Sequence, residues 1–208
     1  MRHYRAKHNP ASNTLSILLI SCLCSLLVGV AGCSSQKRYQ LTSLQLPVEG
    51  SNCCWQATQE LLVDYKDQHI QLLAVLVHQK RSVSLVLLDP FGRRLLSLQK
   101  TGDEVTQYRS PELPDALPED FLLASSMLAW WPRADWDFPQ GKWWLSVVGK
   151  RRQLSYGENV IVSVQYPDQM DPEYGMPIDA ADITEAVVVT HHHYPLRITI
   201  RNQQWHAL

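Results

Sequence analysis

Short stretches in which apolar and polar residues alternate are the feature that most limits how this chain can fold. The alternation is clearest at 82–88, 160–166 and 196–201. Because successive side chains of a strand point to opposite faces, a period of two predicts strands with one buried face. Less regular patterns add strands at 71–78, 94–99, 104–109, 141–149 and 186–191. The sequence therefore predicts a meandering antiparallel sheet.

One stretch has helical spacing instead. Apolar side chains recur between Pro118 and Trp131, where Pro118 suits the first turn of a helix and Pro132 ends it. The residues from Leu62 to Tyr65 fit either a helix or a strand. A mostly β chain (α+β) with one apolar helix predicts an open half-barrel, in which a helical lid covers the open face of a curved antiparallel sheet.

The first 32 residues have the composition of an export signal. Basic residues without acidic ones precede an apolar run at 15–30, which is shorter than the about 20 residues of a membrane-spanning helix. Val30-Ala31-Gly32 then precedes Cys33, a pattern that a bacterial lipoprotein signal peptidase cleaves. We therefore expect a lipoprotein signal peptide at 1–32 and acyl chains, such as palmitate, on Cys33. The alternative is an uncleaved single-span anchor.

Acylation of Cys33 would hold the protein at a membrane, since several acyl chains anchor more firmly than one. Ser34 follows Cys33, where an aspartate typically retains such lipoproteins at the inner membrane, so we expect an outer-membrane address facing the periplasm. We expect residues 33–50 to form the acylated cysteine and a flexible tether, and residues 51–208 to form a single domain. The leader carries three of the 19 basic residues and none of the 20 acidic ones, so the chain without it has a net charge of −4. A net negative charge argues against a nucleic-acid partner.

Cys53 and Cys54 are the cysteines that remain as thiols beyond Cys33. Neighbouring cysteines can close only a strained ring, because their Cα atoms lie nearer than a disulfide prefers. We expect two free or mixed-disulfide thiols, with a vicinal disulfide as the alternative. No other cysteine is left to build a metal cage.

The run from Val83 to Gly92, which ends in Asp89-Pro90-Phe91-Gly92, resembles a hairpin of the lipoprotein-localisation receptor family LolB. In that family, an Asn-Pro-Leu-Gly type turn exposes an apolar side chain at the hairpin tip. The resemblance continues in order through 117–132, like the lid helix, 152–166, like the next strand pair, and 186–205, like the final hairpin. The chain is similar to a divergent branch of LolB-like lipoproteins, of the kind found in gene clusters for aryl polyene lipids.

This resemblance implies an apolar cavity between sheet and lid that removes acyl chains from water. The implied function is to bind acyl or lipid cargo and to assist its delivery or insertion into the outer membrane. The implied partners are membrane lipid around the acyl anchor, a lipid or lipidated cargo, and a periplasmic carrier protein. The candidate cavity and lid residues are Leu85, Leu87, Phe121, Leu122, Leu128, Trp130, Trp131 and Trp143. For the tryptophans, packing in the core is the alternative.

The turn at 90–94 is the candidate membrane-insertion loop. Phe91, between Pro90 and Gly92, would enter the lipid interface. Arg93 and Arg94 would meet anionic head groups. The alternative is a turn in which Phe91 folds back onto the core.

The sequence contains no familiar catalytic motif. It has no Gly-x-Ser-x-Gly elbow, no His-Glu-x-x-His pair and no phosphate loop, so we expect neither enzyme activity nor a cofactor. In His191-His192-His193 at most two side chains could share a metal, and we expect a solvent-facing turn instead. The alternative function is a non-catalytic structural lipoprotein that has a filled core and docks onto an envelope complex.

Overall fold

A computed structural model of the protein describes residues 44–47, 49–114, 117–138, 141–175 and 185–208. The leader and Cys33 lie outside the described residues. Within them, ten strands form one sheet. The strands are β1 (Trp55–Tyr65), β2 (Gln68–Gln79), β3 (Ser82–Leu88), β4 (Arg94–Thr101), β5 (Glu104–Arg109), β6 (Trp143–Val148), β7 (Arg151–Tyr156), β8 (Asn159–Gln165), β9 (Val187–His191) and β10 (Leu196–Ala207).

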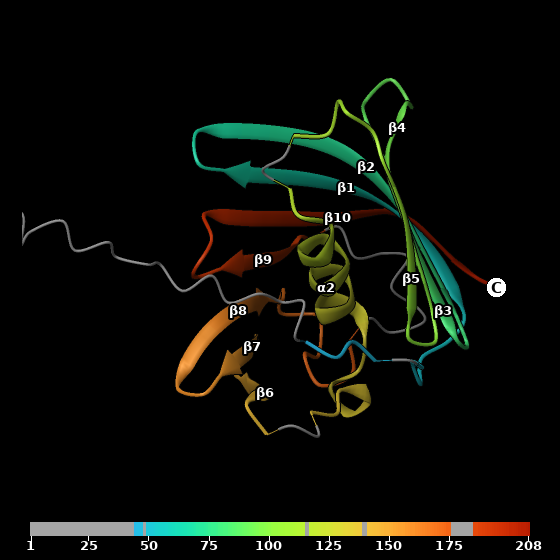
Figure 1. Cartoon of the computed structure of the whole chain (residues 1–208). Coiled ribbons are helices and arrows are strands. Elements are labelled where there is room, and N and C mark those ends of the chain that lie inside the picture. Colours follow the sequence, from blue (N-terminus) through green and yellow to red (C-terminus); the bar gives the residue numbers. More distant parts are fainter. Residues whose placement is uncertain (1–43, 48, 115–116, 139–140, 176–184) are drawn as a thin grey trace, which may run out of the picture. The chain divides into compact units, whose positions relative to one another are not determined.

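The strand order shows how the chain builds an open sheet. It runs β5-β4-β3-β2-β1-β10-β9-β8-β7-β6, and all neighbouring strands are antiparallel. Strands β5 and β6 therefore form the two edges, although they follow each other along the chain. The connection between these edges contains helix α2 (Glu119–Trp130) and the short 3-10 helix η3 (Arg133–Asp135). Figure 1 shows α2 flanked by β3–β5 on one side and by β6–β9 on the other.

Alternation along the strands separates a buried face from a more open one. On β3, Val83, Leu85 and Leu87 are buried, while the residues between them are half-buried. Leu98 on β4 pairs with Leu85 and is buried on the same face. The mostly β, curved antiparallel architecture with one apolar helix confirms the expected fold class at this level.

Helix α2 forms where helical spacing predicted it, but it is buried on all sides instead of covering the sheet from outside. Every residue from Leu122 to Trp130 is buried. A helix that is buried on all sides is a core element, whereas a surface helix keeps one polar face. The expected helical lid is therefore corrected: α2 fills much of the space that the curved sheet encloses.

Two arginines hold the two ends of α2. At the first end, Arg109 of β5 donates to the carbonyl of Leu117 at 3.0 Å and to Glu119 at 2.7 Å. At the other end, the fully buried Arg152 of β7 donates to the carbonyls of Leu128, at 2.9 Å, and Trp131, at 2.5 Å. The bonds from Arg152 satisfy carbonyl groups that the last turn of a helix leaves without partners, whereas Arg109 ties Glu119 to the segment before the helix. Because both ends are fixed, α2 is unsuited to opening and closing.

The last residues of the stretch expected to be a tether pack onto the domain. We call residues 44–50 the strap; position 48 lies outside the described residues. Leu44 is 6% exposed and belongs to the core. A Cβ on Gly50 would lie 2.3 Å from Cε1 of His78 and 2.7 Å from Nε1 of Trp131, so the strap touches these rings closely. The folded unit therefore includes residues from Leu44 onwards that were assigned to the tether.

Two further observations concern the cysteines and the helices of the described residues. Cys53 and Cys54 form a vicinal disulfide in the structure, so the preference for two thiols is corrected in favour of the alternative. Among the described residues, no helix has the length and apolar character needed to cross a membrane.

Candidate functional site

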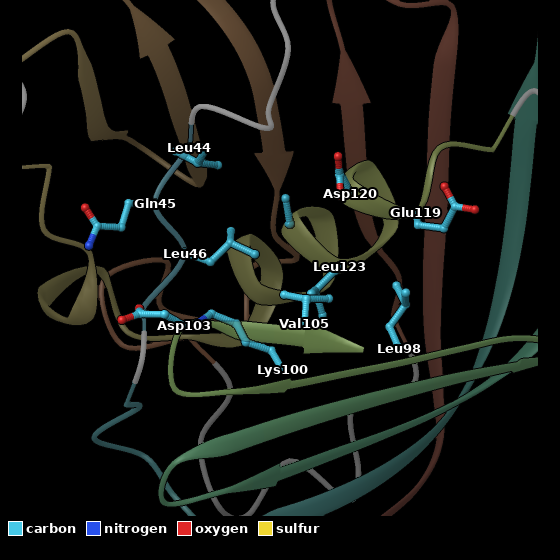
Figure 2. A pocket seen from close by; sticks show the side chains of 11 residues that line it. Leu44, Gln45, Leu46, Leu98, Lys100, Asp103, Val105, Glu119, Asp120 and Leu123 are labelled. Atoms are coloured by element: carbon cyan, nitrogen blue, oxygen red, sulfur yellow. The ribbon is translucent and has the colours of Figure 1, made fainter. Parts of the chain in front are cut away.

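A pocket of about 250 Å³ lies on the buried side of the sheet, between the strap, β4, β5 and the first turns of α2. Figure 2 shows its side chains converging from these four elements. The apolar part of its wall is formed by Leu44, Leu46, Leu98, Val105, Leu123 and Ala124. Its volume is slightly below the about 300–1,000 Å³ of typical small-molecule sites.

Strand register explains why this wall is apolar and open. Lys100 of β4 pairs with Val105 of β5, and Leu98 pairs with Gln107, so these four side chains share the inward face. Strand β5 is exposed along nearly all of its length. Val105 is consequently 47% exposed although it points inward. An apolar side chain that faces the interior without being covered marks the open side of the half-barrel.

Polar groups stand at the two ends of the pocket. At one end, Lys100 is 6% exposed and donates to the carbonyl of Gly102. Burial lowers the pKa of Lys100, and the nearby carboxylate of Asp103 opposes this only in part. At the other end, Glu119 is paired with Arg109, while Asp120 is exposed. The pocket is therefore amphipathic, with apolar walls between polar ends.

A second, very small cavity of about 10 Å³ adjoins Lys100, His78 and Trp131. It has the size of about one water molecule. Trp131 packs on His78 with ring centroids 4.2 Å apart, and Trp55 packs on Trp205 at 4.1 Å. Burial lowers the pKa of His78 to about 4, against a smaller raising effect of Asp135. This aromatic cluster is packed core, with room for about one water.

The residues predicted to line a cavity are placed elsewhere. Leu85, Leu87, Leu122, Leu128, Trp130, Trp131 and Trp143 are buried in the core, and Phe121 is half-buried against it. Trp131 borders the small cavity, and none of the eight lines the larger pocket. The alternative of core packing thus describes the tryptophans. The pocket residues Leu46, Leu98, Val105 and Leu123 were missed because their burial depends on distant partners.

The hairpin between β3 and β4 presents Phe91 to solvent. Phe91 is 88% exposed, so the alternative in which it folds back onto the core is wrong. The carboxylate of Asp89 accepts hydrogen bonds from the backbone N–H groups of Phe91, at 2.9 Å, and Arg93, at 2.8 Å. Gly92 has a φ of 81°, a left-handed conformation that favours glycine. Phe91 therefore projects from a well-bonded turn.

The arginines of this loop already have partners. Arg93 forms an ion pair with Asp89 at 2.7 Å and another with Glu112 at 3.0 Å. Arg94 lies over the ring of Tyr108 at 4.5 Å. Burial alone would raise the pKa of Asp89, but hydrogen bonds from Arg93 and Phe91 outweigh it and lower that pKa. The hairpin tip thus offers an apolar ring beside arginines that already have partners.

The triple histidine differs from the expected solvent-facing turn at its first residue. His191 is the last residue of β9 and is buried. Its Nε2 atom lies 3.0 Å from Oγ of Ser125. Burial, with a smaller effect of His192, lowers the pKa of His191 to about 3. Neither pocket described above touches this serine–histidine pair. The part of the chain that the structure describes also contains no group of three or more His, Cys, Asp or Glu side chains that could hold a metal ion.

Comparison of the amino-acid sequence with protein-family models identifies the family of this chain. The model of a family described as "Protein of unknown function (DUF3261)" matches residues 56–204, from the start of β1 into β10. The chain belongs to this family. The DUF3261 match includes α2 and the β4–β5 wall of the pocket, whereas the strap precedes it. No curated protein matches the chain.

Proposed function

We propose that this protein is a non-enzymatic, lipid-binding lipoprotein, anchored through acylated Cys33 at the periplasmic face of the outer membrane. It holds an acyl chain of its cargo and assists delivery of that cargo to the membrane. The observation that carries the proposal is the pocket of about 250 Å³ with leucine and valine walls on the open side of the half-barrel. Apolar walls stabilise an acyl chain by about 25 cal/mol for each Å² removed from water.

The likeness to LolB-like lipoproteins supports this proposal in two ways. An open antiparallel half-barrel with one helix agrees with the architecture that the likeness implies. The exposed Phe91 on a tight hairpin agrees with the apolar hairpin tip of that family. In this proposal Phe91 enters the membrane interface, and its ring rather than an arginine charge makes the contact.

The direct test is to identify lipid bound to the protein. Residues 34–208 would be exported behind a cleavable leader, purified without detergent and extracted for mass spectrometry. About one acyl chain per protein, and uptake of a fluorescent fatty acid, are the expected results. An empty protein that also takes up no probe would overturn the carrier function.

A second candidate function is a structural lipoprotein that docks onto an envelope complex. The all-round burial of α2 favours it, because most of the enclosed space is filled. An empty protein that co-purifies with one stoichiometric envelope partner would support this candidate.

A further inference from the structure

The strap lies where a bound acyl chain would lie. Leu44 and Leu46 form part of the same pocket wall as Leu98, Val105 and Leu123. In Figure 2, Leu46 faces Leu123 and Val105 across the pocket. Leu44 is nearly fully buried, and Leu46 packs against the core. Two leucines of this chain thus already cover one side of the apolar space between α2 and the β4–β5 wall.

We propose that the groove between α2 and β4–β5 is a site for a single acyl chain, and that Leu44 and Leu46 occupy it when no ligand is bound. This inference rests on the proposed lipid-binding function and specifies its site. The ligand displaces the strap leucines and replaces their contacts with Leu98, Val105 and Leu123.

The dimensions of the groove favour one chain over several. On β4 the wall is formed by Leu98 and Lys100, and on α2 it extends from Glu119 to Ala124. The free volume of about 250 Å³, together with the space of two leucine side chains, suits one acyl chain. A cargo with several chains would leave the others outside the groove.

The strap is held mainly by side-chain packing, which makes it displaceable. With the other described residues, its backbone at 44–47 forms no hydrogen bond to the sheet or to α2. The ion pair between Glu49 and Arg81 is long, at 3.5 Å, and both side chains are exposed. Among the described residues of this segment, hydrogen bonds to the rest of the domain begin at Ser51, which donates to Asp135, and Asn52, which donates to the carbonyl of Trp130. A segment without backbone hydrogen bonds to its neighbours opens at a lower free-energy cost than a hydrogen-bonded strand.

The strap also continues towards the proposed anchor. Ten residues, 34–43, separate Cys33 from Leu44. Even fully extended, the eleven steps from Cys33 to Leu44 span no more than about 40 Å. Acylation of Cys33 would therefore keep the groove close to the membrane from which, or into which, a chain moves.

Two variants that release the strap by different means test this inference. In the first, Leu44→Ser together with Leu46→Ser removes the apolar side chains from the groove. In the second, Gly50→Ala places a Cβ against His78 and Trp131, two residues that do not line the groove, and so disturbs the packing of the strap while leaving Leu44 and Leu46 in place. The matched control is Leu62→Ser, which makes the same chemical change on a half-buried leucine of β1. Each protein is titrated with a fluorescent fatty acid, and its thermal midpoint is measured.

Both strap variants should bind the fatty acid at least about tenfold more tightly than the parent, because apparent affinity rises with the fraction of protein in the open state. The control should bind like the parent, with a stoichiometry of one chain per protein throughout. Unchanged affinity in both variants, or weaker binding in the double serine variant, would overturn the inference while leaving lipid binding intact. If none of the proteins, the parent included, takes up the probe, the proposed function itself fails.

Discussion

Replacement of the buried Arg152 by methionine should lower stability by about 3 kcal/mol. The guanidinium donates to the carbonyls of Pro172, Leu128 and Trp131. Leu128 keeps a second donor, the hydroxyl of Tyr166 at 3.1 Å, so the change leaves two buried carbonyls without a partner. Each such group costs ~1–3 kcal/mol. Relief of the buried charge, whose desolvation lowers the pKa of Arg152, offsets part of this loss.

The assay is urea and thermal unfolding followed by circular dichroism, with Arg151→Met as the matched control. Arg151 is exposed, and among the described residues its side chain donates a hydrogen bond only to the side chain of Gln165, at 3.2 Å. A loss of about 3 kcal/mol corresponds to a fall in Tm of roughly 6–12 °C for a domain of this size. If Arg152→Met were as stable as Arg151→Met, the cost of burying the charge would equal the gain from its hydrogen bonds. The view that Arg152 fixes α2 would then be refuted.

Two other predictions concern the hairpin and the buried histidine. Phe91→Glu should abolish co-sedimentation with phospholipid vesicles without shifting Tm, because Phe91 is 88% exposed. The control Val148→Glu, at another exposed apolar position, should leave vesicle binding unchanged. Equal effects of the two would exclude a special role for the hairpin tip. Because burial lowers the pKa of His191 to about 3, the unfolded state takes up a proton that the folded state does not, so stability should fall as the pH drops from 6.5 towards 3. His191→Phe should flatten this fall in urea titrations at stepped pH, and an unchanged slope would assign the acid sensitivity to other groups.

Local pattern predicted most of the strands and the helix, and it failed where the pattern was mixed. Strand β1 was ambiguous because Gln59 points to its buried face while Leu62 points outward. Its position beside β10, with Leu61 opposite Ile200, joins the two ends of the domain. Periodicity in a window of ten residues contains no information about such a pairing.

The candidate site also combines a feature that is encoded locally with one that depends on distant segments. The exposed Phe91 could be expected from the Pro-Phe-Gly turn, since the tight turn is encoded locally. The pocket could not, because Leu46 lies in a polar stretch that resembles a linker, and Val105 belongs to a strand that is exposed on both faces. These residues become a wall only when α2 crosses between the two sheet edges.

By itself, the sequence determined the alternation that makes β3 and the first half of β10 one-sided, and the helical stretch that becomes α2. Each of these depends on neighbours along the chain. The tertiary structure alone decided that α2 is core rather than lid, that the strap packs instead of trailing free, and that the open apolar space lies beside β4 and β5. The physical reason is that burial is a property of the assembled layers: an apolar side chain becomes core or pocket wall according to which distant segment covers it.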